Sequence, residues 1–196
     1  MNLAAVLGAF AVIFPLELPD KSLIAALVLS TRYRPWPVWI GVAAAFTVHV
    51  ALAVAFGSLA ALLPERLVGA VVVIGFAVGA AVLLFKSEEV DEEEGEALAE
   101  RAKASSRAAA ASAFGVIFVA EWGDLTQLMT ANLVARSGAP LSVAGGALVA
   151  LWAVAAIGIV GGRFLLRHVP LALIRKARGV LLAGLAVWTA IDVIRG

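Results

Sequence analysis

Four carboxylates stand at matched positions in two strongly apolar stretches of the chain. Glu17 and Asp20 lie within FPLELPDKSLIAA. Glu121 and Asp124 lie within FVAEWGDLTQLMT. In a continuous helix, the three-residue spacing would place both carboxylates of each pair on one face. A charged side chain at the centre of a lipid bilayer opposes insertion by about 2.5–3.5 kcal/mol, so the four carboxylates need a neutralising positive charge. They predict the binding of a cation or of protons.

Polar side chains beside the carboxylates would support such a site. Ca²⁺ and Mn²⁺ favour carboxylate, carbonyl and hydroxyl oxygens. We therefore expect the metal ligands to be Glu17, Asp20, Glu121 and Asp124. The supporting metal or proton site would include Lys21, Ser22, Thr126, Gln127 and His49. A lone histidine such as His49 in an apolar stretch is more often a hydrogen-bonded packing residue than a ligand or a proton relay.

Helix-breaking residues accompany both pairs. Pro15 and Pro19 flank Glu17, and Gly123 stands at the position that matches Pro19. Such residues remove a backbone hydrogen bond or loosen the helix, which frees carbonyl oxygens that could join the carboxylates as ligands.

The elements that must position these residues are membrane helices. The chain of 196 residues is 63% hydrophobic and 15% charged, and its mean hydropathy of +1.02 lies outside the range of ordinary soluble domains. A helix needs roughly 20 apolar residues to cross a bilayer. Six stretches are long enough: about 3–31, 37–62, 67–86, 108–135, 141–166 and 170–194. The expected fold class is all-α, a polytopic membrane protein with six transmembrane helices. Without cysteine, a bound metal must accept oxygen or imidazole ligands.

The carboxylates recur because the chain is an internal duplication. Glu121 follows Glu17 by 121 − 17 = 104 residues, and the same offset pairs Phe14 with Phe118 and Gly41 with Gly145. We expect a first three-helix repeat over 1–86, an acidic cytoplasmic linker over 87–107 and a second three-helix repeat over 108–196. A repeat of three spans makes the second copy enter from the opposite side, so the two repeats would be inverted, as in many secondary transporters.

Basic residues near the ends of the stretches predict the orientation. One side carries Arg32, Arg34, Lys86, Arg101, Lys103, Arg107, Arg163, Arg167, Arg175, Lys176 and Arg178. The other side carries Arg66, Arg136 and Arg195. Because basic residues favour the cytoplasmic side, we expect both termini outside and residues 87–107 in the cytoplasm.

These features resemble the Golgi calcium/manganese transporter family and its bacterial manganese exporters. That family's signature is Glu-x-Gly-Asp-[Lys/Arg]-[Ser/Thr], present twice, and this chain carries Glu-Leu-Pro-Asp-Lys-Ser from Glu17 and Glu-Trp-Gly-Asp-Leu-Thr from Glu121. The resemblance covers nearly the whole chain. It departs from the signature at Pro19, where glycine is usual, and at Leu125, where a basic residue is usual.

The resemblance implies a secondary transporter that exports Mn²⁺, and in some members Ca²⁺, from the cytoplasm in exchange for protons. The transported ion would be the only metal, with no permanent cofactor and no nucleic acid partner. The compact duplicated chain is similar to prokaryotic members, which implies a bacterial plasma membrane. Assembly into a homo-oligomer is left open.

Two alternatives remain from the residues alone. Asp20 and Asp124 could form the dyad of an intramembrane aspartyl protease, although such proteases carry a Gly-x-Gly-Asp pattern and a dyad would give the two glutamates no role. The chain could also export an organic solute on a similar fold. Lys21 is then the one intramembrane basic residue available to bind an organic anion.

Overall fold

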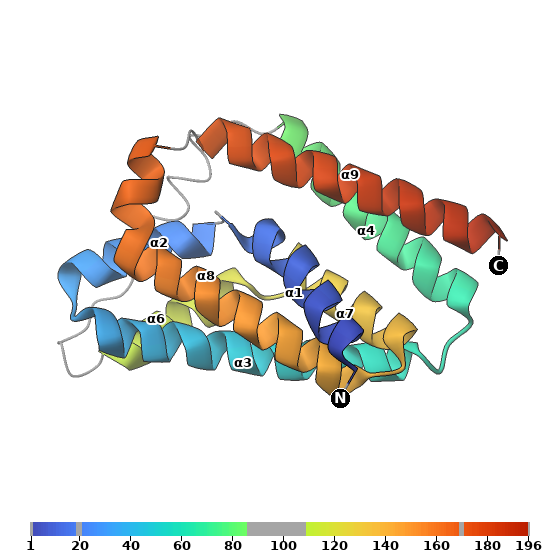
Figure 1. The fold of residues 1–196 in the computed structure, drawn as a ribbon, viewed down its shortest axis with the longest axis horizontal. Coiled ribbons are helices and arrows are strands. Elements are labelled where there is room, and N and C mark those ends of the chain that lie inside the picture. Colours follow the sequence, from blue (N-terminus) through green and yellow to red (C-terminus); the bar gives the residue numbers. More distant parts are fainter. Residues whose placement is uncertain (1, 19–20, 86–108, 169–170, 196) are drawn as a thin grey trace.

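The computed structural model describes residues 2–18, 21–85, 109–168 and 171–195 (Figure 1). In these ranges all the regular elements are α-helices. They are α1 (Leu3–Glu17), α2 (Lys21–Arg32), α3 (Pro35–Ala60), α4 (Glu65–Phe85), α6 (Ala109–Ala120), α7 (Leu125–Ser137), α8 (Pro140–His168) and α9 (Leu171–Arg195). The expected all-α class is confirmed for this part of the chain.

The first and fourth predicted stretches are each divided into two helices. α1 ends at Glu17 in the first stretch, and α6 ends at Ala120 in the fourth. Leu18 has an extended backbone, with φ −87° and ψ 124°, because a following proline disfavours the helical conformation. Gly123 has φ 71°, a left-handed conformation that glycine adopts without steric cost. The two breaks therefore follow from Pro19 and Gly123.

Pro15 has a different effect from Pro19, because it lies inside α1 without ending it. Other helix ends follow ordinary rules. Asn2 caps α1 by accepting a hydrogen bond from the backbone N–H of Ala5 at 3.3 Å. Pro35 begins α3 at a position where its missing N–H has no intrahelical role.

Six helices share the larger hydrophobic core, which joins residues of α1, α2, α3, α6, α7 and α8. α3 packs against α6 and α7, while α8 packs against α1 and α2. The central helix of each half therefore contacts the broken helix of the other half. α3 and α8 also contact each other, and the indole N–H of Trp152 donates to the carbonyl of Ala43 at 3.2 Å. This packing brings the two breaks to the same region of the molecule.

α4 and α9 lie side by side along one flank of this core (Figure 1). A second hydrophobic cluster attaches the pair to α1 and α7. It is formed by Leu16, Val72, Phe76, Ala80, Met129, Leu182 and Ala186.

Two glycines allow the halves to approach closely. A Cβ on Gly41 of α3 would lie 2.1 Å from the carbonyl oxygen of Ala110 in α6. A Cβ on Gly146 of α8 would lie 2.2 Å from the carbonyl oxygen of Val6 in α1. Ala110 and Val6 are separated by the repeat offset of 110 − 6 = 104 residues. Gly146 therefore has the same packing role in the second half as Gly41 has in the first. The repeat offset instead matches Gly41 with Gly145, where a Cβ would meet no atom within 4 Å.

Two helices in the described ranges are long and apolar enough to cross a membrane. They are α3 and residues 140–161 of α8. Shorter apolar helices cover Leu3–Glu17, Arg66–Val82 and Ala109–Ala120. The breaks explain why the first and fourth stretches, which appear continuous in sequence, do not meet this criterion as single helices.

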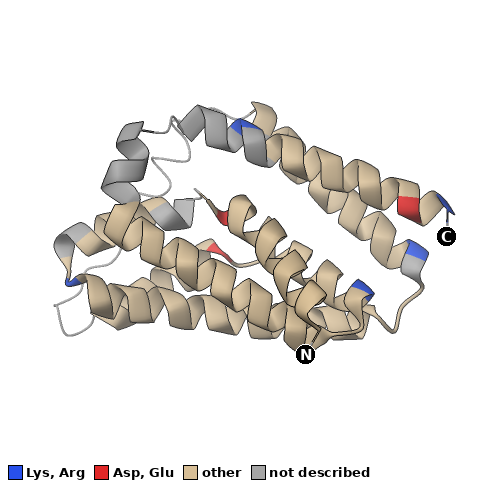
Figure 2. Cartoon of the chain, in the orientation of Figure 1, with Lys and Arg blue, Asp and Glu red and all other residues tan. Residues whose placement is uncertain are grey.

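Charged residues are segregated along the described helices. Figure 2 shows Lys and Arg towards the helix ends, whereas acidic residues lie at the breaks in the middle of the bundle and near the end of α9. Lys176 and Arg34 are exposed, and Glu17 and Glu121 are buried. Among the described residues, the buried charged groups are therefore acidic.

Candidate cation-binding site

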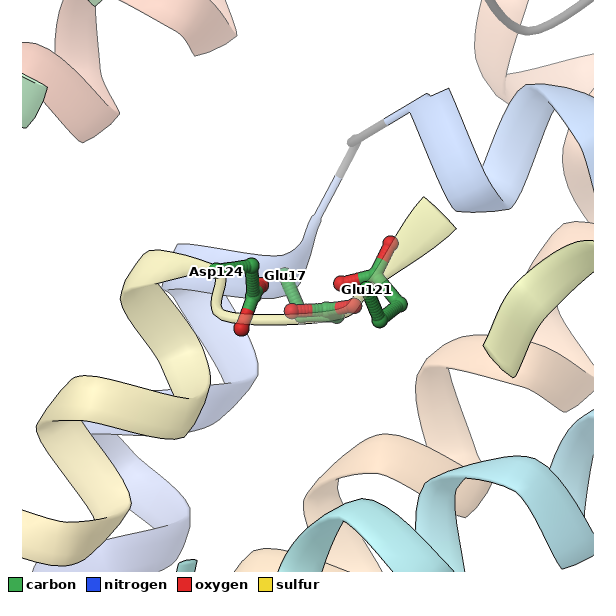
Figure 3. A group of neighbouring side chains, drawn as sticks. All are labelled: Glu17, Glu121 and Asp124. Carbon is green, nitrogen blue, oxygen red and sulfur yellow. The ribbon is translucent and has the colours of Figure 1, made fainter. Parts of the chain in front are cut away.

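Three carboxylates from the two breaks converge at the centre of the bundle (Figure 3). Glu17 ends α1, and Glu121 and Asp124 lie in the turn between α6 and α7. One carboxylate oxygen of each residue lies within 4.8 Å of those of the other two. Glu17 is 0% exposed and Glu121 is 2% exposed, while Asp124 is half-buried. Groups from opposite halves of the chain thus share one site.

Glu121 and Asp124 come together through a turn, so the expectation of one continuous helical face is wrong for this pair. The N–H of Glu121 still bonds to the carbonyl of Ile117 at 2.9 Å. The N–H of Asp124 then bonds to the carbonyl of Glu121 at 3.4 Å, around Gly123. The helix breaks between the two acids instead of carrying both on one face.

Asp124 also begins α7 as its N-cap. Its Oδ1 accepts a hydrogen bond from the backbone N–H of Gln127 at 2.8 Å. A carboxylate is well suited to this position because the first turn of a helix presents unsatisfied N–H groups and a partial positive charge. The cap fixes the Asp124 carboxylate beside the other two.

Two threonines of α7 line the site. The hydroxyl of Thr126 donates to Oε2 of Glu17 at 2.7 Å, and both residues are buried. The hydroxyl of Thr130 donates to the carbonyl of Thr126 at 2.8 Å. The first bond links α7 directly to the end of α1.

His49 of α3 lies against the same break. Its Nε2 is 3.1 Å from the carbonyl oxygen of Phe118, and its Nδ1 is 3.2 Å from Nε2 of Gln127. The imidazole also stacks on the ring of Phe118, with centroids 5.0 Å apart. Gln127 completes the arrangement by accepting a hydrogen bond from the N–H of Gly123 at 2.9 Å.

These side chains surround a cavity of about 10 Å³, close to the smallest volume that holds one water molecule. Its polar lining consists of Glu17, His49, Glu121, Asp124, Thr126, Gln127 and Thr130. Its apolar lining consists of Phe46, Val50, Ala53 and Leu151. There is no lysine or arginine among these described lining residues.

The structure brings together six of the nine residues singled out from sequence: Glu17, Glu121, Asp124, Thr126, Gln127 and His49. Asp20 lies outside the described residues. Lys21 and Ser22 belong to α2, and their side chains are likewise outside the described part. Sequence reasoning missed Thr130, which follows Thr126 by one helical turn. That spacing was the available signal.

Comparison with known proteins identifies the family. The family model for the divalent cation/proton antiporter GDT1 matches residues 5–91 and 109–196. The chain belongs to this family. A GDT1-like protein of Synechocystis sp. is 31% identical over 89% of this chain and 92% of its own length. The chloroplastic protein PAM71 of Arabidopsis thaliana is 28% identical over 95% of this chain, and its homolog is 26% identical over 89%.

This chain spans 56% and 55% of the lengths of those two plant proteins. No solved structure matches it. The resemblance seen in the duplicated motifs is confirmed, and the cyanobacterial relative is consistent with a bacterial branch. This member of a GDT1 family is a membrane-embedded cation/proton antiporter, not an enzyme, so the aspartyl protease alternative is set aside.

Proposed function

We propose that this GDT1 family member exports a divalent cation, Mn²⁺ or Ca²⁺, from the cytoplasm in exchange for protons through the central carboxylate site. The observation that supports this most directly is the convergence of Glu17, Glu121 and Asp124 within 4.8 Å. Oxygens on opposite sides of a Ca²⁺ ion bound at 2.3–2.6 Å lie about 4.6–5.2 Å apart. The three carboxylates are thus spaced for a single ion, which is the transported substrate.

Exchange follows from competition for the same oxygens. Three carboxylates so close together, two of them buried, favour a bound cation or protons, because burial and neighbouring negative charges both disfavour the ionised form. A divalent ion neutralises the carboxylates in the ion-bound state, and protons neutralise them in the protonated state. Asp20 completes the ligand set in this proposal, with Lys21 and Ser22 beside it.

The crossed packing of the helices supports two inverted three-helix repeats, over 1–86 and 108–196, joined by a cytoplasmic linker over 87–107. α3 contacts the broken helix of the second half, and α8 contacts that of the first. The family model also matches the chain in two stretches. In this proposal the broken pairs α1–α2 and α6–α7 each count as one span, which gives six spans with both termini outside. Rocking of the repeats would open the site to either side of the bacterial plasma membrane.

The size of the cavity favours an ion over an organic solute. A space of about 10 Å³ accommodates one water-sized particle, whereas pockets for organic ligands measure roughly 300–1,000 Å³. The alternative of an organic-solute exporter predicts that candidate solutes compete with Mn²⁺ for transport.

The test is Mn²⁺ and proton flux in proteoliposomes that contain the purified protein. We expect Asp124→Asn to abolish Mn²⁺ uptake together with proton counterflow, because it removes one of three converging charges. Asp192→Asn is the matched control, since it makes the same change in an exposed side chain of α9. Native rates of both fluxes in Asp124→Asn, or competition by an organic solute, would contradict the proposal.

A further inference from the structure

The break between α6 and α7 frees the carbonyl of Phe118 and the N–H of Gly123, which a continuous helix would pair within itself. The N–H of Trp122 would bond to the carbonyl of Phe118 in such a helix. Instead it bonds weakly to the carbonyl of Val119 at 3.4 Å. The N–H of Gly123, at φ 71°, also leaves the helical pattern. Backbone N–H and C=O groups are strong hydrogen-bonding groups, so both are expected to find partners outside the helical pattern.

His49 and Gln127 supply both partners. The carbonyl of Phe118 pairs with Nε2 of His49 at 3.1 Å, and the N–H of Gly123 donates to Oε1 of Gln127 at 2.9 Å. The two side chains meet at 3.2 Å, between Nδ1 of His49 and Nε2 of Gln127. A continuous chain of hydrogen bonds therefore joins one side of the break to the other through α3.

The backbone groups at its two ends fix the direction of every bond. A carbonyl only accepts, so Nε2 of His49 carries the hydrogen and Nδ1 is the acceptor. A backbone N–H only donates, so Oε1 of Gln127 faces Gly123 and the amide nitrogen donates to His49. Both ring nitrogens of His49 are thus occupied by protein groups, which leaves neither free to bind an ion.

The residues at the matching positions of the first half cannot form the same hydrogen bonds. At the repeat offset of 104, His49 matches Ala153, Gln127 matches Leu23 and Gly123 matches Pro19. Alanine and leucine side chains form no hydrogen bonds, and proline has no backbone N–H. This hydrogen-bonded arrangement is therefore specific, by residue type, to the half of the site that contains Glu121 and Asp124.

We propose that His49 and Gln127 are positioning residues for transport, which hold the turn at 121–124 so that its carboxylates face Glu17. This inference rests on the proposed function. It assigns to His49 a role in ion affinity, in place of the ligand or proton-relay role considered from sequence. Groups that orient metal ligands in this manner typically change metal affinity by about 10–100-fold when removed.

The test measures Mn²⁺ binding to the purified protein in detergent and the number of protons moved per Mn²⁺ in proteoliposomes. His49→Ala and Gln127→Leu should each weaken Mn²⁺ binding by about 10-fold or more. The double variant should bind Mn²⁺ only slightly more weakly than either single variant, because the loss of one side chain already interrupts the series of hydrogen bonds. The ratio of protons to Mn²⁺ should stay unchanged in all three.

Conservative variants separate positioning from proton transfer. His49→Gln retains an amide donor near the position of Nε2, and it should recover part of the lost affinity with native proton coupling. Thr47→Ala is the control on α3, because the Thr47 hydroxyl bonds only within its own helix, to the carbonyl of Ala43 at 2.7 Å. It should bind Mn²⁺ as the unmodified protein does.

Loss of proton coupling in His49→Gln with native Mn²⁺ affinity would overturn the inference, since His49 would then carry a proton. Mn²⁺ affinity within twofold of native in both His49→Ala and Gln127→Leu would also overturn it. If Asp124→Asn abolishes binding under those conditions, the proposed function stands and only the positioning role fails. If Asp124→Asn binds Mn²⁺ natively, the proposed function itself fails.

Discussion

At the scale of single residues, the buried acid Glu17 depends on a group from the other half of the chain. The Thr126 hydroxyl donates to its Oε2 at 2.7 Å. Hydrogen bonds to charged groups contribute roughly 1.5–3 kcal/mol, more than bonds between neutral groups. Thr126 therefore orients the Glu17 carboxylate while its own backbone carbonyl is held by Thr130.

We predict that Thr126→Val raises the KM for Mn²⁺ by about 10-fold, because valine keeps the shape of threonine and removes this donor. Thr126→Ser retains the hydroxyl and should stay close to the native KM. Mn²⁺ uptake by proteoliposomes over a range of ion concentrations measures both. Equal KM values in the two variants would show that the hydroxyl is not what matters at this position.

At the scale of elements, close helix contacts depend on individual glycines. Gly146 faces the backbone of α1, whereas its neighbour Gly145 has open space around its Cα. Overpacking of a tight contact typically costs 1–3 kcal/mol, and replacing an unconstrained helical glycine by alanine gains roughly 0.5–1 kcal/mol. Adjacent positions are therefore expected to respond in opposite directions.

We predict that Gly146→Ala lowers the thermal unfolding temperature of the detergent-solubilised protein. Gly145→Ala should leave that temperature unchanged or raise it. The pair is well matched, since both variants add one methyl group to the same turn of α8. A similar loss of stability in both would indicate that the approach of α1 to α8 is not the cause.

The sequence predicted much of this arrangement through residue types. Pro19 and Gly123 indicated loosened helices beside the carboxylates, and the predicted metal site grouped Glu17 with Glu121. It did not predict how the second break is stabilised. The partnership of His49 with Gln127 joins positions 78 residues apart, and it depends on which face of α3 meets α6. The sequence also did not predict that Gly146, and not Gly145, contacts α1. The repeat offset matches positions in the sequence, but it does not determine which face of a packed helix meets its neighbour.

At the scale of the whole molecule, α4 and α9 form a pair attached to the six-helix core by a smaller hydrophobic cluster. An ion pair between Arg136 of α7 and Asp192 of α9 adds a polar link at one end. Their side chains are 37% and 57% exposed. Exposed ion pairs contribute about 0–1 kcal/mol and are screened by salt.

We predict that Asp192→Asn lowers the free energy of unfolding by less than about 1 kcal/mol, with a smaller effect at high salt. Leu182→Ala, at a fully buried position of the cluster, should cost about 2–5 kcal/mol. Denaturation of the detergent-solubilised protein at two salt concentrations compares the two contributions. A larger loss from Asp192→Asn would make the ion pair the main attachment of α9.

The small volume of the central cavity has a consequence for selectivity. In the proposed site, an ion held by the three carboxylates in a space of about 10 Å³ would have to exchange most of its coordinated water for protein oxygens. Mg²⁺ dehydrates reluctantly and usually keeps several waters when proteins bind it. On the proposed function, loss of the hydration shell would discriminate among divalent ions and would disfavour Mg²⁺ without a residue dedicated to rejecting it.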